Sequence, residues 1–220
     1  MEIRQRALGA IQFMYNRILR DRLPRTYGRY NGVVARHRRW LDLTDDDPDY
    51  KKGLIDAVHE CVDRGDRVVV VGGGRGVSSV HCVLAGADEV IAYEPASKML
   101  EVGRETVENA HVDSVEFRQA TVGTPVEIYG DDAGATRLAP GELPEADAII
   151  LDCEGSELQI ADEMPAYPAA IVETHPERDV APKRVQQALE ERKYTVTSRP
   201  YRPKGEHLSV GKRILVGIRS

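Results

Sequence analysis

Ionisable side chains gather after two apolar segments in the second half of the chain. Asp152, Glu154 and Glu157 follow the first segment, whereas Glu173 ends the second and His175 comes two residues later. If both segments are parallel strands, their carboxyl ends meet at one edge of a sheet and bring these groups together. Repulsion between crowded carboxylates raises the pKa of one of them towards neutrality, which suits a general base that takes a proton from a hydroxyl. We predict Glu154, Glu173 and His175 as the catalytic candidates, with Glu173 or His175 as the base or as the anchor of an acceptor.

Other interpretations of these residues stay open. Glu157 also fits a carboxylate in the first turn of a helix, where it faces the helix dipole. His175 also fits a structural hydrogen bond. The same oxygen and nitrogen donors could bind a metal ion, but no recognisable ligand spacing repeats, so no metal is predicted.

A glycine-rich turn follows a run of four valines earlier in the chain. A ligand can approach the backbone closely where Cβ atoms are absent, and glycine permits the positive φ of a strand-to-helix turn. The dinucleotide fingerprint GxGxxG needs a small residue where Val77 stands, so it fails, whereas the GxGxG spacing of S-adenosylmethionine (SAM) enzymes fits. We predict that SAM is bound by this turn, with contacts from Gly72, Gly74, Arg75, Gly76 and Val77. A turn that holds no ligand is the alternative.

A second signal lies 18 residues beyond Gly76, where Glu94 and Pro95 end the next predicted strand. A carboxylate at this point can accept hydrogen bonds from both ribose hydroxyls of a cofactor. NAD sites use the same device, so Glu94 by itself does not separate the two cofactors. We predict that Glu94 and Pro95 contact the cofactor, and that Asp152 or Glu154 contacts its methionine end or the acceptor.

Alternating strand and helix patterns supply the elements that must position these residues. Strands are predicted at 67–71, 89–93, 114–119, 146–151 and 169–173, and helices at 77–85, 96–109, 156–163 and 181–192. Such alternation predicts an α/β fold with a doubly wound parallel sheet and right-handed crossovers. Two final strands, 194–198 and 213–218, have no helix between them and should pair antiparallel. This ending predicts the seven-stranded, Rossmann-like sheet of class I methyltransferases, with an antiparallel last strand.

The region before the sheet differs from the rest of the chain in charge. Residues 1–40 contain ten arginines against Glu2 and Asp21, which gives +8 and leaves −14 for residues 41–220 out of the net −6. The acidic charge of residues 41–220 disfavours a general nucleic-acid surface. Because the charge changes in this way along the chain, we divide it into a basic extension at 1–46 and a SAM-binding domain at 47–220.

Local patterns within the extension predict helical and irregular structure. An amphipathic pattern at 2–20 predicts a helix that packs on the domain or on the second subunit of a homodimer, with a membrane-surface helix as the alternative. Residues 21–44 are predicted to be irregular, and Asp47-Pro48 predicts the start of the next helix. Residues 130–146, rich in Gly, Asp and Pro, are predicted to be a loop.

The composition fits a soluble globular protein, with 41% hydrophobic and 30% charged residues. No apolar run approaches the ~20 residues that span a bilayer, and the first residues lack the features of a signal peptide. The three cysteines show no CxxC spacing, so neither a disulfide framework nor a zinc site is predicted. We expect the protein in the cytoplasm.

Four segments together resemble the FkbM family of SAM-dependent methyltransferases. They are the glycine turn with its preceding strand (68–77), Tyr93-Glu94-Pro95, the stretch Leu151-Asp152-Cys153-Glu154-Gly155-Ser156-Glu157, and Ile171-Val172-Glu173-Thr174-His175. The resemblance covers roughly residues 65–176 and implies that Ala120 and Thr121 lie beside the adenine of SAM. It departs from the family pattern at Val70, where many members have Asp, and at Cys153, where Val is usual.

The resemblance implies methyl transfer to a hydroxyl of a sugar or another small molecule. We therefore predict a SAM-dependent O-methyltransferase with a small-molecule acceptor. The alternatives are a SAM-binding module without catalysis and a nucleic-acid methyltransferase that uses the arginine-rich N-terminus. An NAD-linked oxidoreductase is disfavoured by GxGxG and by the final antiparallel pair.

Overall fold

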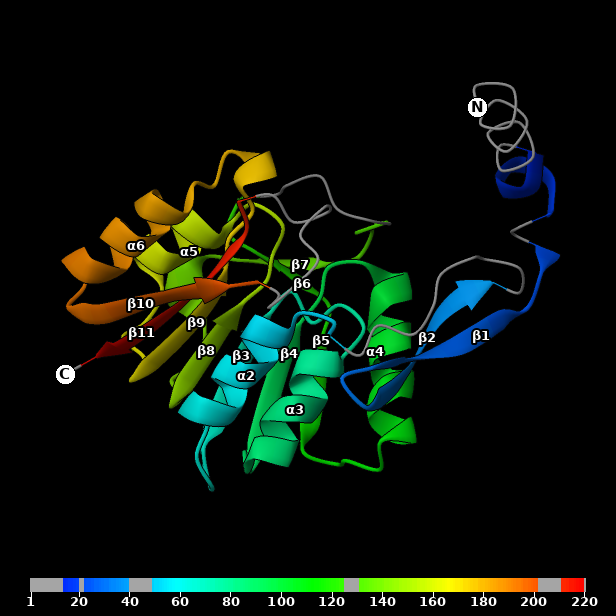
Figure 1. Ribbon diagram of the computed structural model, residues 1–220, viewed down its shortest axis with the longest axis horizontal. Coiled ribbons are helices and arrows are strands. Elements are labelled where there is room, and N and C mark those ends of the chain that lie inside the picture. Colours follow the sequence, from blue (N-terminus) through cyan, green and yellow to red (C-terminus); the bar gives the residue numbers. More distant parts are fainter. Residues whose placement is uncertain (1–13, 20–21, 40–48, 125–130, 202–210, 220) are drawn as a thin grey trace.

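A mixed sheet of seven strands forms the centre of the molecule. The computed structural model describes residues 14–19, 22–39, 49–124, 131–201 and 211–219, and within them the strand order is β10-β11-β9-β8-β3-β4-β5 (Figure 1). The parallel strands are β3 (Arg67–Val71), β4 (Glu89–Tyr93), β5 (Val115–Arg118), β8 (Ala148–Leu151) and β9 (Ala169–Glu173). Strand β11 (Arg213–Arg219) runs antiparallel to β9 and to β10 (Tyr194–Pro200). The predicted fold class is confirmed.

Helices cover both faces of this sheet. One face carries α2 (Lys52–Cys61), α3 (Val77–Ala85) and α4 (Ser97–Asn109), and the other carries α5 (Glu157–Glu163) and α6 (Pro182–Glu191). Side chains alternate along a strand, so Val68 and Val70 of β3 enter the first core, whereas Val69 and Val71 enter the second. All four are buried, as expected for a central parallel strand covered on both sides.

The basic extension contains a β-hairpin, so the prediction of irregular structure at 21–44 is wrong for the described residues there. Strands β1 (Arg25–Tyr30) and β2 (Val33–Arg39) pair antiparallel around Asn31-Gly32. Both turn residues have positive φ, 46° and 83°, as a two-residue hairpin turn that follows the strand twist requires.

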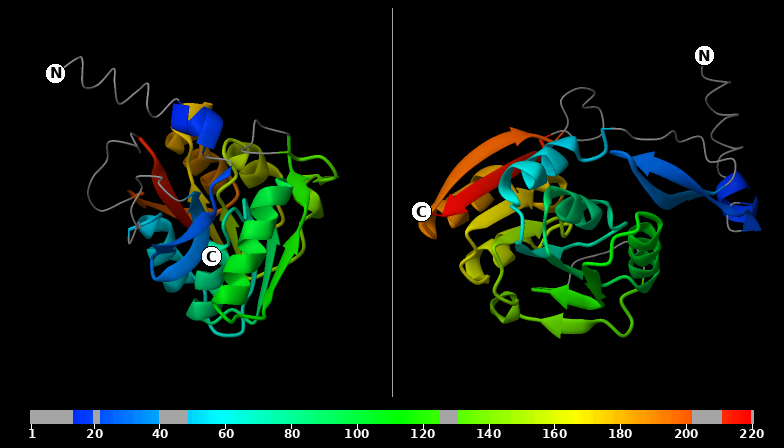
Figure 2. Two further views of the ribbon diagram at one scale, coloured as in Figure 1. Left: turned by 90° about the vertical axis from the view of Figure 1, so that its right-hand side faces the viewer. Right: turned by 90° about the horizontal axis from the view of Figure 1, so that it is seen from below.

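The closed end of the hairpin packs on the domain. Tyr30 and Val33 are buried, β2 lies against α4, and Arg36 pairs with Glu105 of α4 at 2.8 Å. The open end stands away from the sheet together with the short π-helix η1 (Tyr15–Leu19) (Figures 1 and 2). The amphipathic helix predicted at 2–20 lies mostly outside the described residues.

Two further boundaries differ from the sequence prediction. Asp47 and Pro48 lie outside the described residues, and α2 begins only at Lys52, because Lys51 at its N-cap has the left-handed values φ 48° and ψ 36°. The loop predicted at 130–146 contains β7 (Thr136–Leu138), which pairs in parallel with β6 (Ala120–Val122), and the 3₁₀ turn η3 (Pro140–Glu142). A second 3₁₀ turn, η4 (Pro176–Arg178), follows β9.

None of the helices within the described ranges has the length and apolar character that crossing a membrane requires. Cys61, Cys82 and Cys153 are free thiols.

Candidate functional site

A cavity of about 330 Å³ opens at the carboxyl ends of β3, β4 and β8. This is the edge at which open α/β sheets bind their ligands. Its lining includes ten of the thirteen residues predicted for the site: Gly72, Gly74, Arg75, Val77, Glu94, Pro95, Ala120, Thr121, Asp152 and Glu154. The other three, Gly76, Glu173 and His175, do not line it.

The glycine turn needs its glycines for two different reasons. Gly72 has φ 88°, and a Cβ there would lie 1.9 Å from the backbone oxygen of Asp152, so no side chain fits between β3 and the segment after β8. Gly76 has φ 79° at the N-cap of α3, and a Cβ there would meet the backbone oxygen of Gly103 in α4 at 2.8 Å. Helix packing therefore explains Gly76, and its contact with a cofactor stays a prediction.

Glu94 is bound into the glycine turn through both carboxylate oxygens. Oε2 accepts the backbone N–H of Gly74 at 2.8 Å, and Oε1 accepts that of Ala96 at 2.9 Å. The residue is only 7% exposed, and burial raises the pKa of its carboxyl above the usual range, against the two backbone bonds. Each carboxylate oxygen keeps a second acceptor position, so Glu94 can still bind two hydroxyls in the cavity.

Beyond Glu94, the cavity wall is mostly apolar. Tyr93, Pro95 and Met99 line one side, and the short strand β6 contributes Ala120 and Thr121. Thr121 is buried and adds a hydroxyl to this wall. A flat, partly apolar ring such as a nucleobase fits such a wall.

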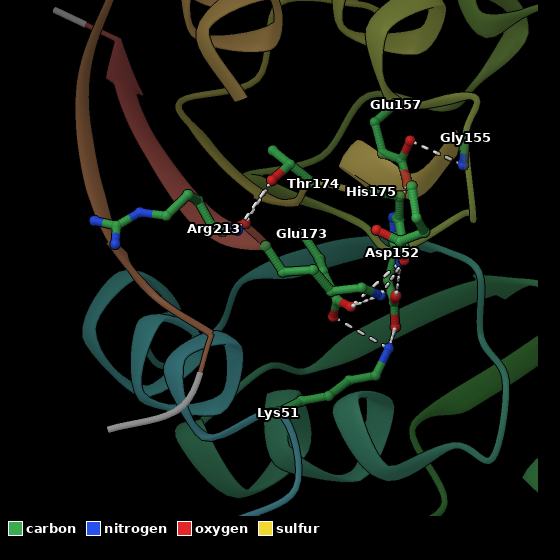
Figure 3. Close-up of polar contacts among 10 residues, drawn as sticks. Lys51, Asp152, Gly155, Glu157, Glu173, Thr174, His175 and Arg213 are labelled. Carbon is green, nitrogen blue, oxygen red and sulfur yellow. Dashed lines mark hydrogen bonds and ion pairs between the residues drawn. The ribbon is translucent and has the colours of Figure 1, made fainter. Parts of the chain in front are cut away.

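Behind another part of the cavity wall, five charged residues form a chain that leads from the cavity into the core. We call this chain the buried charge network; it comprises Lys51, Asp152, Glu157, Glu173 and His175 (Figure 3). The Lys51 ammonium binds Asp152 and also lies 3.2 Å from Oε2 of Glu173. Lys51 and Asp152 line the cavity, whereas the other three members are buried behind them.

His175 lies at the inner end of the network. Its Nδ1 bonds Oε1 of Glu157 at 2.5 Å, and its Nε2 lies 3.3 Å from Glu173 and 3.9 Å from Asp152. Oε2 of Glu157 also accepts the backbone N–H of Gly155, which belongs to the turn after β8. Glu157 thus ties the turn to the histidine.

The structure places Glu173 and His175 behind the cavity wall. Their side chains are 1% and 0% exposed and do not line the cavity, whereas their neighbours Lys51 and Asp152 do. A catalytic role for Glu173 or His175 stays a prediction. Glu154 does line the cavity, with a left-handed φ of 56°.

Burial and mutual charge shift the pKa values within the network. Burial and the Glu173 charge raise the pKa of Asp152, although Lys51 and His175 oppose this. For Glu173, burial is outweighed by Lys51 and His175, so its pKa is lowered. Burial disfavours the charged imidazole of His175, but its bonds to Glu157 and Glu173 outweigh burial and raise its pKa to about 10.

The network also bears on the open question of a metal ion. Ligand-type atoms of Asp152, Glu173 and His175 all lie within 4.8 Å of one another. The cation that both carboxylates bind is the ammonium of Lys51, so their closeness is explained without a metal ion. Sequence reasoning missed Lys51 and its neighbour Tyr50 in the cavity wall, because neither belongs to a recognisable motif.

No family model matches the sequence. A 90-residue stretch, 41% of the chain, is 28% identical to an uncharacterized protein of Sulfolobus islandicus rod-shaped virus 1, and it spans about half (48%) of that relative.

Solved structures give broader similarity. The fold matches a ribosomal protein L11 methylase from Lactobacillus delbrueckii subsp. bulgaricus with a TM-score of 0.57 and 10% identity, over 83% of this chain and 91% of that one. It matches a magnesium protoporphyrin IX methyltransferase from Synechocystis with bound SAM, with a TM-score of 0.55 and 16% identity, over 77% of this chain and 79% of that one. It also matches an rRNA methylase from Streptococcus thermophilus, with a TM-score of 0.52 and 12% identity, over 75% of this chain and 93% of that one. The chain therefore has the Rossmann-like fold that these methyltransferases share.

Proposed function

We propose that this protein is a SAM-dependent methyltransferase. The observation that carries the proposal is the cavity at the carboxyl edge of the sheet, where a glycine turn with GxGxG spacing is bonded to the buried Glu94 carboxylate. A carboxylate in this place recognises the two ribose hydroxyls of a nucleoside. The structural neighbours support a methyltransferase, since each of those described above is a methylase or methyltransferase.

We assign a part of the cavity wall to each part of SAM. The ribose binds Glu94, the adenine lies against Pro95, Ala120 and Thr121, and the methionine part passes over the glycine turn towards Asp152. Gly72 supports this arrangement, because only a bare backbone leaves room between the turn and the segment after β8. The resemblance to the FkbM family, carried by the Glu94-Pro95 and Asp152–Glu157 elements, agrees with it.

For the acceptor, we propose a hydroxyl of a small molecule. SAM supplies an activated methyl group, and the chain must align the hydroxyl oxygen with it and receive the hydroxyl proton. Glu154 is the best-placed base, because it is the one predicted catalytic residue that lines the cavity. Its left-handed backbone also fits a functional position, since strained residues gather at such sites.

An RNA acceptor is the second candidate. The hairpin strands carry Arg25, Arg29, Arg36, Arg38 and Arg39, and the open end of the hairpin stands clear of the sheet (Figure 1). Arginines on a projecting element suit phosphate contacts. Against this candidate, Arg36 is already paired with Glu105, and residues 41–220 carry −14.

The discriminating experiment follows radiolabelled methyl groups from SAM into two acceptor pools. One pool holds hydroxylated small molecules and the other holds total RNA. Label in the small-molecule pool that is lost in Glu154→Gln supports the proposal. Label in RNA, with binding that weakens steeply as salt rises, favours the second candidate; SAM binding without transfer to any acceptor favours a non-catalytic binding module.

A further inference from the structure

Lys51 occupies an unusual place for a lysine. It is the N-cap of α2 and adopts the left-handed region, at φ 48° and ψ 36°. Its backbone oxygen accepts the N–H groups of Leu54 and Ile55, so the first turn of α2 fixes this conformation. A non-glycine residue held in this region at a cavity wall points to a functional constraint.

The side chain of Lys51 connects the cavity with the core. The ammonium binds Asp152, lies 3.2 Å from Glu173 and is 5.7 Å from the ring centre of Tyr50 (Figure 3). Its side chain is 14% exposed, against 9% for Asp152 and 1% for Glu173. A lysine buried to this degree is stable only because two carboxylates share its charge.

The two carboxylates also depend on the Lys51 ammonium. Two buried carboxylates that bind one ammonium cannot both stay ionised without it, because like charges at close range force one of them to take up a proton. Asp152 is the vulnerable one, since Glu173 also has His175 at 3.3 Å and Lys212 at 3.4 Å. The imidazole of His175 is 3.9 Å from Asp152 and is itself engaged by Glu157.

The cavity offers three acidic side chains to a ligand: Glu94, Asp152 and Glu154. Glu94 is fixed at the ribose end by its two backbone bonds. Of the other two, Asp152 adjoins the glycine turn through its backbone: its N–H donates to the oxygen of Val71 at 2.9 Å, and its own backbone oxygen touches the space that a Cβ of Gly72 would fill. A carboxylate oxygen that already accepts one ammonium can accept a second donor.

Resting on the proposed function, we propose that Lys51 is a positioning residue of this site: its ammonium favours the ionised form of Asp152 at the cavity wall, where the carboxylate receives the α-ammonium group of SAM. Lys51 acts through Asp152, so its loss should change the pH dependence of cofactor binding rather than abolish the pocket. A lysine with only a structural role would lower the stability of the protein without moving that dependence.

The test compares Lys51→Met with Lys51→Arg and with the matched control Lys52→Met. Lys52 is the next residue, its side chain is 38% exposed, and it pairs with Asp56 on its own helix. Dissociation constants for SAM are measured by calorimetry from pH 6 to 9. The ratio of variant to wild type is taken at each pH, so that ionisation of SAM itself cancels.

For Lys51→Met we expect the dissociation constant for SAM to rise about tenfold or more at pH 7, because a charge-assisted bond is lost. The ratio should shrink towards pH 9, where Asp152 ionises without help, and Lys51→Arg should restore most of the affinity. Lys52→Met should match the wild type throughout. A ratio near one, or a ratio that does not vary with pH, would overturn the proposal.

A carboxyl ¹³C NMR titration of Asp152 in the cofactor-free protein separates the effect of Lys51 on Asp152 from the proposed binding of SAM. We expect Lys51→Met to raise the titration midpoint of Asp152 by at least about one pH unit, whatever ligand the cavity binds. An unchanged midpoint would refute the role of Lys51. If the midpoint moves but the wild type binds no SAM, the proposed function fails and the cofactor contact fails with it, while the electrostatic role of Lys51 is confirmed.

Discussion

Replacing Glu94 by glutamine removes a carboxylate at a position where both of its oxygens are used. One oxygen accepts the N–H of Gly74 at 2.8 Å and the other that of Ala96 at 2.9 Å. Glutamine has one oxygen and one NH₂ group, so in either orientation one of these backbone donors faces another donor. A buried donor left without a partner costs about 1–3 kcal/mol, and we expect the free energy of unfolding to fall by that amount.

Glu94→Gln should also weaken the binding of the cofactor. Each charge-assisted bond from a ribose hydroxyl to Glu94 contributes about 1.5–3 kcal/mol, and about 1.4 kcal/mol corresponds to a factor of ten. We therefore expect the dissociation constant for SAM to rise about 10- to 100-fold in Glu94→Gln, measured by calorimetry beside urea denaturation. Glu101→Gln, on the exposed face of α4, is the matched control and should change neither quantity.

Two outcomes would refute this reasoning in different ways. If Glu94→Gln lowers stability but leaves the SAM affinity within about twofold of the wild type, Glu94 only supports the glycine turn. If neither quantity changes, the two backbone bonds to Glu94 contribute nothing measurable.

Three further predictions follow from the geometry. In Gly72→Ala the new Cβ would lie 1.9 Å from a backbone oxygen, so this variant should lower the melting temperature far more than Gly65→Ala. Gly65 has a similar φ of 94° but nothing within 4 Å of a Cβ, so Gly65→Ala should cost only the backbone strain of a positive φ, about 1–2 kcal/mol. Equal losses in the two variants would show that crowding at Gly72 is unimportant. Burial lowers the pKa of His175, but two carboxylates of the buried charge network outweigh burial and raise this pKa to about 10. The charged imidazole therefore stabilises the folded protein fully below pH ~6.5, and this contribution is lost as the pH rises through 10. Urea denaturation should therefore show a loss of up to about 1.4 kcal/mol per pH unit between these values, and an equal slope in His175→Gln would contradict this. Because the Lys51 ammonium already binds two carboxylates of the network, EDTA should leave SAM affinity and methyl transfer unchanged, and a loss that Mg²⁺ or Zn²⁺ restores would contradict this.

The sheet and the part of the cavity wall formed by the glycine turn and Glu94 were open to prediction because they depend on local patterns. Each central strand is a short apolar run bounded by turn residues, and the order of strands and helices determines the sheet topology. Glycines and a strand-end carboxylate mark the cavity because their chemistry requires those residue types. This is why Gly72 and Glu94 are found where the sequence predicts them.

The hairpin escaped prediction although a local signal was present. Asn31-Gly32 is a strong two-residue hairpin turn, but the flanking arginines obscure the alternation of β1 and β2. Only alternate residues such as Tyr30 and Val33 are buried, and they are buried against helices far along the chain. The short pair β6 and β7 is equally non-local, since its strands are separated by more than ten residues.

The inner half of the site could not be derived from sequence because it depends on side-chain depth. Adjacent strand ends do bring Asp152, Glu173 and His175 together, as predicted. Which of them faces the cavity depends on how the turn after β8 folds back, and on Lys51, which arrives from the start of α2 more than 100 residues earlier in the chain. No spacing in the sequence links that lysine to the strand ends.

The central claim is that the cavity binds SAM, and calorimetry on the wild-type protein tests it most directly. SAM, its demethylated product and NAD are titrated separately under one buffer condition. Saturable one-site binding of SAM and of its demethylated product, with none of NAD, is the predicted result. Binding of NAD alone, or of none of the three, would contradict the account.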